Sequence, residues 1–261
     1  MENAARAWNA IGEHWAAMQG EAGDGNQQWI INPALFALAG EVAGLRVLDA
    51  ACGGGHIARA LTRRGATVTG VDISAAMIGA AKRASAGLAI DFRVADISAM
   101  PELADSSFDL AVCSMALMNV ADIANAFREL ARVLKPGGHL VFSLPHPCYP
   151  RRPGSHGVAR EDEDDWLEYH RVGSYLDEGE YPMSLPSADG ESHPVPTFHR
   201  TLTTLIVLLV DSGFVIDGLI EPMPSDTPEA KQELGLGWWH ATCRIAYYLV
   251  MRAACVSSPS Q

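Results

Sequence analysis

A glycine-rich segment near residue 50 is the part of this sequence best suited to hold a ligand. Asp49 closes a short apolar run, Gly53, Gly54 and Gly55 follow it, and a helix-like stretch comes next. From its first glycine the segment matches G-x-G-x-x-G/A, in which glycines let the backbone approach a nucleotide-type ligand. A carboxylate this close would repel a bound pyrophosphate by roughly 4 kcal/mol at an intermediate dielectric. The segment therefore predicts a nucleotide-type ligand that carries positive charge near Asp49.

Two further acids follow the next two expected strands. Asp72 comes about 20 residues after Gly53, which is the spacing at which an acid binds a ribose diol. Asp96 follows the third strand, where its carboxylate could accept a hydrogen bond from an adenine amino group while Ile97 or Ile73 packs on the ring. Acids at three successive strand ends favour an adenosine ligand with positive charge. S-adenosylmethionine, which carries an ammonium and a sulfonium group, meets that description.

Simpler roles stay open for several of these residues. Asp49 could cap a helix, and Asp96 could only shape a turn. Met115 follows the fourth strand and is expected to be a wall of the same site, although it could equally fill the core. Ser74 is better placed than Asp72 to be the N-cap of the helix that comes next.

Apolar runs alternate with helical patterns in residues 41–256, which are expected to form one domain. Strands are expected at 47–48, 66–71, 92–94, 108–114 and 139–144, and helices at 56–64, 74–84 and 122–134. This alternation predicts an α/β fold of the Rossmann-like kind, with a mostly parallel sheet covered by helices on both faces. A helix at 200–212 and strands at 215–220 and 245–251 follow, and the two late strands predict a hairpin at the sheet's edge. In such sheets a ligand lies beyond the carboxyl ends of the strands, where the glycines and acids are expected.

Two segments lie outside this pattern. Residues 1–40 are expected to form an N-terminal helical lid in two pieces. Trp8 and Trp15 are two helical turns apart and share one helix face, which covers either the cofactor and acceptor or the domain surface. Residues 145–196 are rich in proline and glycine and predict a substrate-covering insert after the fifth strand. Residues 257–261 are expected to be a frayed tail.

Residues after the fourth and fifth strands should face the same crevice. Leu117 and Met118 offer an apolar wall for an acceptor molecule, and Tyr149 is expected to line the same pocket. His146 follows the fifth strand and is a candidate general base, because imidazole titrates near neutral pH. The alternative, a histidine that is hydrogen-bonded within a proline turn, stays open.

The composition argues against several classes of partner. The chain of 261 residues has a formal net charge of -12, and its lysines are Lys82, Lys135 and Lys231. It lacks the basic footprint that nucleic acids and anionic membrane surfaces require. The five cysteines are scattered, so no metal site is predicted and a reducing cytoplasm is expected. No membrane span or signal peptide is visible. A small-molecule substrate is the expected partner, and a homo-oligomer stays open.

Four stretches resemble the class I S-adenosylmethionine-dependent methyltransferases, in particular the small-molecule group related to ubiquinone- and menaquinone-pathway enzymes. VLDAACGGGHIARAL resembles that family's first motif, and VTGVDISAAMI resembles its second. ADISAMPELADSSFDLAVCSMAL resembles the adenine-binding segment with the fourth strand, and ANAFRELARVLKPGGHLVFS the helix and strand that follow. The resemblance is specific over residues 42–144. It departs at Ala51 and Cys52, where the family usually has a glycine–cysteine pair, and a mild effect is expected because the strand has ended there.

The strand ends and the resemblance together give one predicted site. The expected cofactor-binding residues are Asp49, Ala51, Gly53, Gly55, Asp72, Ile73, Met77, Asp96, Ile97 and Met115, and the expected substrate-binding residues are Trp8, Trp15, Leu117, Met118 and Tyr149. The resemblance implies S-adenosylmethionine as cofactor, a seven-stranded sheet whose last strand is antiparallel, and methyl transfer to an N, O or C atom of a small molecule in specialised metabolism. Two alternatives remain: a methyltransferase-like protein that binds its cofactor without turnover, and a nucleotide-dependent oxidoreductase, which Asp49 disfavours.

Overall fold

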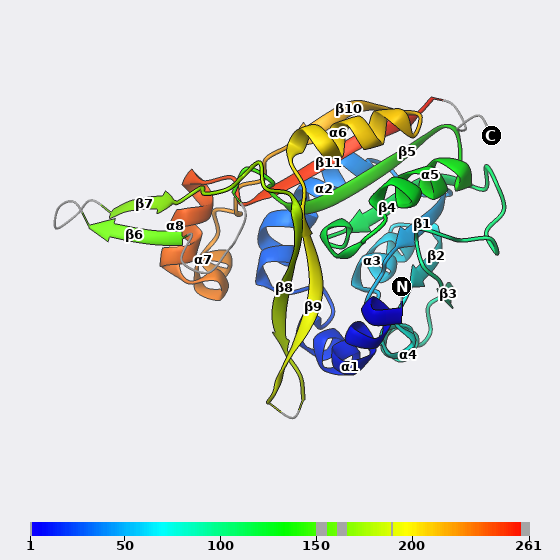
Figure 1. The fold of residues 1–261 in the computed structure, drawn as a ribbon. Coiled ribbons are helices and arrows are strands. Elements are labelled where there is room, and N and C mark those ends of the chain that lie inside the picture. The colour runs from blue at the N-terminus through cyan, green and yellow to red at the C-terminus, as the bar shows by residue number, and fades with distance from the viewer. Residues whose placement is uncertain (1, 150–155, 161–165, 189, 257–261) are drawn as a thin grey trace.

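A seven-stranded sheet forms the centre of the protein (Figure 1). The computed structural model describes residues 2–149, 156–160, 166–188 and 190–256, so the expected frayed tail at 257–261 lies outside the described residues. The strand order is β10-β11-β5-β4-β1-β2-β3, with β11 antiparallel to both neighbours and the other pairs parallel. The strands are β1 (Arg46–Ala50), β2 (Thr67–Asp72), β3 (Ile90–Val94), β4 (Phe108–Ser114), β5 (Leu134–Pro145), β10 (Phe214–Ile220) and β11 (Tyr248–Cys255). The predicted Rossmann-like sheet is confirmed.

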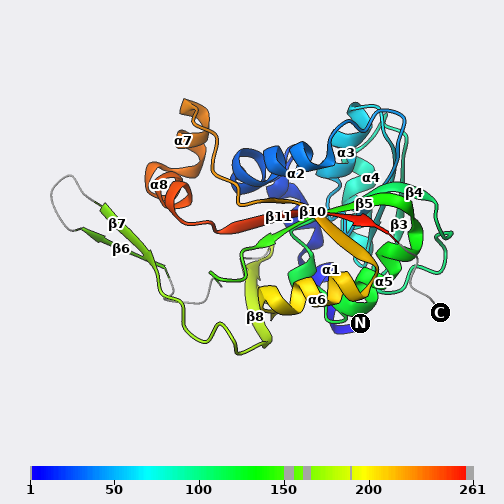
Figure 2. The same cartoon turned by 90° about the horizontal axis from the view of Figure 1, so that it is seen from above.

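Helices cover both faces of this sheet (Figure 2). On one face lie α2 (Asn32–Ala39), α3 (His56–Arg63) and α4 (Ala75–Ala84); on the other lie α5 (Ile123–Val133) and α6 (Leu202–Asp211). Each helix buries one apolar stripe, as Leu61 of α3 and Phe127 of α5 illustrate. Leu48 of β1 is opposite Thr69 of β2 and Ala111 of β4 in parallel register, so these strands end at one common edge.

The first 40 residues divide between two places. α1 (Glu2–Gln19) packs on α4 so closely that a Cβ on Gly12 would lie 3.0 Å from the Ala76 Cβ. Asn9 Oδ1 also accepts hydrogen bonds from Ser74 Oγ and the Ala76 N–H, at 2.9 and 3.1 Å. The π-helical turn η1 (Gln27–Ile31) and α2 follow, and α2 joins the core of the sheet. Within the first 40 residues, α1 and the turn that follows it therefore cover the carboxyl ends of the strands.

The described residues of the insert after β5 form two hairpins. These are β6 (His156–Arg160) with β7 (Trp166–His170), and β8 (Gly179–Pro186) with β9 (Ser192–His199). The first projects away from the sheet in Figure 1, while Leu185 and Val195 of the second pack against Ile11 of α1. Prolines are compatible with such a two-stranded ribbon because both strands are edges. The described part of the insert that reaches the strand ends is thus the β8–β9 hairpin.

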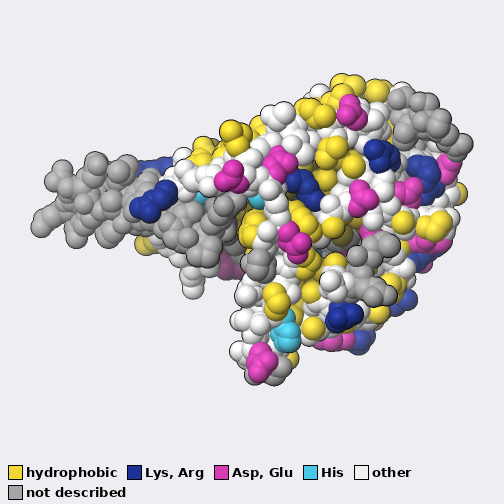
Figure 3. All heavy atoms as spheres, viewed as in Figure 1, with side chains coloured by type: hydrophobic (Ala, Val, Ile, Leu, Met, Phe, Trp, Pro, Cys, Tyr) yellow, Lys and Arg dark blue, Asp and Glu magenta, His cyan; other side chains and the backbone are white. Residues whose placement is uncertain are grey.

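The last two strands pair as the predicted antiparallel hairpin, but two short helices connect them. α7 (Pro228–Leu234) and α8 (Leu236–Arg244) lie between β10 and β11 and were missed from the sequence. Ala241 and Tyr247 pack there with Ile30 and Ile31 of η1. None of the described helices is long and apolar enough to cross a bilayer. Hydrophobic side chains lie at the surface over α6 and β10 (Figure 3), and strand β10 is at one edge of the sheet.

Candidate active site

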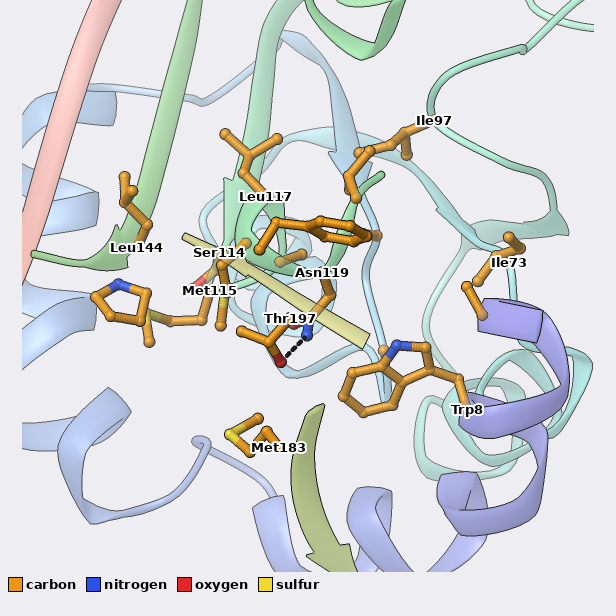
Figure 4. A pocket seen from close by; sticks show the side chains of 18 of the residues that line it. Trp8, Ile73, Ile97, Ser114, Met115, Leu117, Asn119, Leu144, Met183 and Thr197 are labelled. Carbon is orange, nitrogen blue, oxygen red and sulfur yellow. Dashed lines mark hydrogen bonds between the residues drawn. The ribbon is translucent and has the colours of Figure 1, made fainter. Parts of the chain in front are cut away.

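A cavity of about 1000 Å³ lies at the carboxyl ends of the strands, between α1 and the β8–β9 hairpin (Figure 4). The residues after β1, β2, β3, β4 and β5 meet in it, as the sheet order predicts. The predicted site residues that line it are Trp8, Trp15, Ala51, Gly53, Asp72, Ile73, Met77, Asp96, Ile97, Met115, Leu117, Met118 and His146. Three others lie outside this lining: Asp49, Gly55 and Tyr149.

The glycines of the first loop have different tasks. Gly53 has φ +51°, and its N–H donates to Asp72 Oδ2 at 2.9 Å. A Cβ on Gly53 would meet only Gln19 Oε1 within 4 Å, so this position leaves space for a ligand. Gly55 has φ +78°, and a Cβ there would lie 2.9 Å from the Phe92 ring. Gly55 is therefore required by its backbone conformation and by packing, not by contact with the cavity.

Two cavity-lining residues other than glycine have a backbone conformation in the left-handed region. Ala51 has φ +57° and Met115 has φ +53°, and each costs about 1 kcal/mol there. Met115 is held by its N–H, which lies 3.0 Å from the Ser143 carbonyl and 3.1 Å from Ser143 Oγ. The alanine that replaces the family's usual glycine is thus under conformational strain. The mild effect expected at Ala51 rested on its position beyond the strand and did not include its positive φ.

Asp72 presents its carboxylate to the cavity in a fixed orientation. Oδ2 accepts from the Gly53 N–H and Oδ1 accepts from the Ser74 N–H, at 2.9 and 2.8 Å. Burial raises the pKa of Asp72, and the two backbone donors oppose that shift. Ser74 Oγ accepts from the Met77 N–H at 3.2 Å, which confirms Ser74 as the N-cap of α4. Each Asp72 oxygen keeps a lone pair, so the carboxylate can accept hydrogen bonds from a diol.

Asp49 lies beneath the loop and not against the cavity. Its residue is 1% exposed, and its Oδ2 has no hydrogen-bond partner among the described residues. Burial raises its pKa to about 7, with the nearby Asp72 adding to the shift. At neutral pH the group is therefore only partly ionised. The repulsion of a pyrophosphate that the sequence predicts requires a full charge on Asp49, and burial of this carboxyl weakens it.

Asp96 shapes a turn and also lines the cavity. Its Oδ1 accepts from the Ser98 N–H and from Ser98 Oγ, at 2.9 and 2.7 Å, so it shapes a turn. It also lines the cavity with the buried Ile97 and with Ile73, which starts the turn after β2. An aromatic ring held between Ile73 and Ile97 would have the Asp96 carboxylate near its edge.

Comparisons with known proteins agree with this geometry. Residues 48–142 match the family model described as "Methyltransferase domain". A solved S-adenosylmethionine-dependent methyltransferase from Mesorhizobium loti is 32% identical, with a TM-score of 0.70 over 90% of this chain and 100% of that one. This chain belongs to the S-adenosylmethionine-dependent methyltransferases. A putative methyltransferase of the same kind from Listeria monocytogenes is 25% identical, with a TM-score of 0.66 over 85% of this chain and 95% of that one.

A curated relative matches a shorter part of this methyltransferase. The ubiquinone biosynthesis O-methyltransferase of Alkalilimnicola ehrlichii is 41% identical over 107 residues, which are 40% of this chain and 43% of that enzyme. The chain thus spans less than half the length of that relative.

The residues present fit the methyltransferase cofactor. Gly53 leaves open space, Asp72 offers a fixed carboxylate beside it, and the buried imidazole of His56 lines the cavity with neither nitrogen hydrogen-bonded to a described residue. Asp72 would hold the ribose, and Ile73 and Ile97 would flank the adenine. His56 was missed from the sequence, where it looks like an ordinary first residue of a helix.

The end of the cavity away from Asp72 is mostly apolar. Met115 and Leu144 approach it from the sheet, and Met183 approaches from the hairpin (Figure 4). Asn119 Nδ2 donates to Thr197 Oγ1 at 3.2 Å and to the Pro196 carbonyl at 2.9 Å, which fastens β9 to the turn after β4. The hairpin residues were missed from the sequence. The alternation of Tyr181, Met183 and Leu185 along β8 is the signal that could have found them.

His146 lines the cavity, but both of its ring nitrogens have protein partners. Nδ1 accepts from the Cys148 N–H at 3.2 Å, and Nε2 lies 3.0 Å from Glu221 Oε1. Burial lowers its pKa, and Glu221 partly offsets that effect. A neutral ring with its proton on Nε2 satisfies both contacts and leaves no lone pair for a substrate. Tyr149 packs on this ring at 5.2 Å and on His170 at 5.8 Å, outside the cavity lining.

Proposed function

We propose that this protein transfers the methyl group of S-adenosylmethionine to a small, largely apolar molecule held beside it in the same cavity. The observation that carries this proposal is the continuity of the cavity, from Asp72 and Ile97 at one end to Leu117 and Met183 at the other. Its volume of about 1000 Å³ is at the upper end of the range for ligand pockets, which suits a cofactor together with a second molecule.

The work left to the chain's own residues is alignment and exclusion of water. S-adenosylmethionine, when bound, supplies a methyl group that its sulfonium already activates for in-line displacement. Asp72 would fix the ribose, while Trp8 would put an aromatic face toward the positive charge. Trp8 and Trp15 pack edge to face, 6.3 Å apart, so α1 offers this surface as one rigid wall. The apolar hairpin residues would position the acceptor.

Oxygen is the favoured methyl acceptor because curated relatives are named O-methyltransferases. Nitrogen and carbon acceptors are the alternatives, and a place in specialised metabolism stays a prediction. Turnover with a labelled methyl donor and matched phenol, catechol and amine acceptors tests the proposal. Label in a phenol or catechol product would support it, while cofactor binding without transfer to any acceptor would favour a binding protein. The comparisons lend no support to an oxidoreductase, and tight NAD binding would overturn the assignment.

Asp72→Ala should weaken S-adenosylmethionine binding by about 10- to 100-fold, because it removes a charge-assisted hydrogen bond to the ribose. Isothermal titration calorimetry measures this directly. Asp91→Ala is the matched control, since Asp91 is an exposed acid that pairs with Arg93. Thermal unfolding must show that the Asp72 variant is folded, because the Gly53 and Ser74 N–H groups lose their acceptor. Unchanged affinity in a folded Asp72 variant would remove this residue from the site.

His146→Gln should change turnover by less than about tenfold and leave cofactor affinity unchanged, because the imidazole is held by Cys148 and Glu221. A general base usually contributes about 10²- to 10⁴-fold. Steady-state kinetics with the acceptor identified above measure the effect. A loss of that larger size, with cofactor affinity intact, would restore His146 as the base and would require its ring to turn toward the acceptor.

A further inference from the structure

His56 is a buried imidazole without a hydrogen-bonding partner among the described residues. It is the first residue of α3, directly after Gly55, and it is 6% exposed. Neither Nδ1 nor Nε2 makes a hydrogen bond to a residue that the structure describes, and His56 lines the cavity. Buried polar groups in folded proteins are nearly always hydrogen-bonded. An orphaned imidazole at the wall of a ligand cavity therefore indicates that the ligand supplies its partner.

The polar groups near this end of the cavity already pair with one another. The Gln27 N–H donates to Asp24 Oδ1 at 2.9 Å, and Gln27 Oε1 accepts from the Asp24 N–H at 3.0 Å. Gln19 Nε2 lies 3.4 Å from the same Gln27 oxygen. Arg59, one turn further along α3, donates to the Gly54 and Gly20 carbonyls. His56 differs from these residues because both of its ring nitrogens are buried and neither has a hydrogen-bond partner among the described residues.

We propose that His56 is a cofactor-binding residue that donates an N–H to the carboxylate at the amino-acid end of S-adenosylmethionine. The proposal rests on the proposed function and on the order of groups along the cavity. Asp72 suits the ribose, and Asp96 and Ile97 lie on the adenine side of it. The amino-acid end is then left for the loop around Gly53 and His56. A carboxylate only accepts hydrogen bonds, and an imidazole N–H is the donor it finds there.

The charge on His56 should respond to such a ligand. Burial and the positive Arg59 lower the pKa of His56 to about 4, so the ring is neutral at pH 7 before the ligand binds. A carboxylate beside the ring raises that pKa, so binding takes up a proton and strengthens as the pH falls toward 4. The other titratable groups near His56 are the buried Asp49, the cavity-lining Asp72 and Asp24, and the neutral thiol of Cys52. Asp49 responds with the opposite sign, because the ligand's ammonium favours its ionised form.

Binding of two cofactor analogues separates the carboxylate from the rest of the ligand. Calorimetry would compare S-adenosylmethionine with decarboxylated S-adenosylmethionine, which keeps the ammonium and the sulfonium, on wild type and His56→Leu. Wild type should prefer the carboxylated ligand by about tenfold or more, and His56→Leu should show little preference. His56→Gln keeps an N–H donor and should keep most of the preference while losing its dependence on pH.

A second measurement excludes a structural role for this histidine. Without ligand, His56→Leu should unfold at the same or a higher urea concentration than wild type, because it removes an unsatisfied buried group. Lower stability of this variant, an equal loss of both ligands, or an unchanged preference would each overturn the proposal. If wild type binds neither ligand, the proposed function itself fails. If wild type binds both ligands and the variants keep its preference for the carboxylated one, only the role of His56 fails.

Discussion

Replacing Asp49 by asparagine should raise the free energy of unfolding by about 4 kcal/mol at pH 8 and by less than half of that at pH 5. The buried carboxyl of Asp49 has a pKa of about 7 in the folded protein, above its ordinary value of 3.8. Between these values the folded protein holds a proton that the unfolded chain has released. Stability therefore falls as the pH rises through this window and stays low above it. Asparagine does not ionise, so it lacks this loss.

His56 has the opposite effect on the wild-type curve. Its pKa is lowered from 6.5 to about 4, so in this range the unfolded chain binds the extra proton and stability rises with pH. The two slopes oppose each other between about pH 4 and 6.5. Through these two groups, wild type should lose stability mainly from about pH 6.5 to just above 7, where Asp49 titrates without opposition.

Urea unfolding of wild type and Asp49→Asn at several pH values from 5 to 8 isolates the Asp49 contribution, because other groups cancel in the difference. Asp109→Asn is the matched control. Lys135 and the Arg46 N–H lower the pKa of Asp109, so this carboxylate is ionised in both states throughout the range. The control difference should not change with pH. If the Asp49 difference were equally flat, the carboxyl would not carry the raised pKa.

Asp72 and Asp49 show how far the sequence predicts the site. Both lie at the carboxyl ends of parallel strands, and the alternation of strands with helices places both at one edge of the sheet. Asp72 does line the cavity, because its strand ends at the ligand space. Asp49 does not, because the loop through Gly53 folds over it. Position along a strand predicts the end at which a side chain lies, but its depth depends on how the next loop packs.

Contacts between segments that are far apart along the chain also could not be predicted from the sequence. His146 was placed correctly at the cavity, but Glu221, which occupies its Nε2, comes from the segment after β10. The sequence left open a histidine that is hydrogen-bonded within a proline turn, which the Cys148 N–H contact matches, but it does not show the pairing with Glu221. The β8–β9 hairpin was hidden for another reason: its prolines suppress the usual strand pattern. Tolerance of proline depends on the hairpin standing apart from the main sheet, which is a property of the fold.

Arg59→Met should cost about 3 to 5 kcal/mol of unfolding free energy, although helical arginines are usually exposed. Arg59 is 1% exposed. Its guanidinium donates to the Gly54 carbonyl at 2.7 Å and to the Gly20 carbonyl at 2.9 Å, and it lies 3.2 Å from Glu21. It thereby ties the glycine loop to the end of α1. Methionine fills similar space but leaves the buried Gly54 carbonyl without this donor.

Arg63→Met is the matched control for this effect. Arg63 lies one turn later on α3 and pairs with the same Glu21, but its side chain is 53% exposed. Its loss should cost less than about 1 kcal/mol, as exposed ion pairs usually do. Arg59→Lys should fall between the two, because an ammonium cannot reach three separated acceptors as a planar guanidinium does. If Arg59→Met and Arg63→Met cost the same in urea unfolding, the buried hydrogen bonds add nothing beyond the ion pair. In that case α1 would be held over the cavity by its other contacts, which include those of Gly12, Asn9, the Glu13–Arg83 ion pair and its apolar side chains.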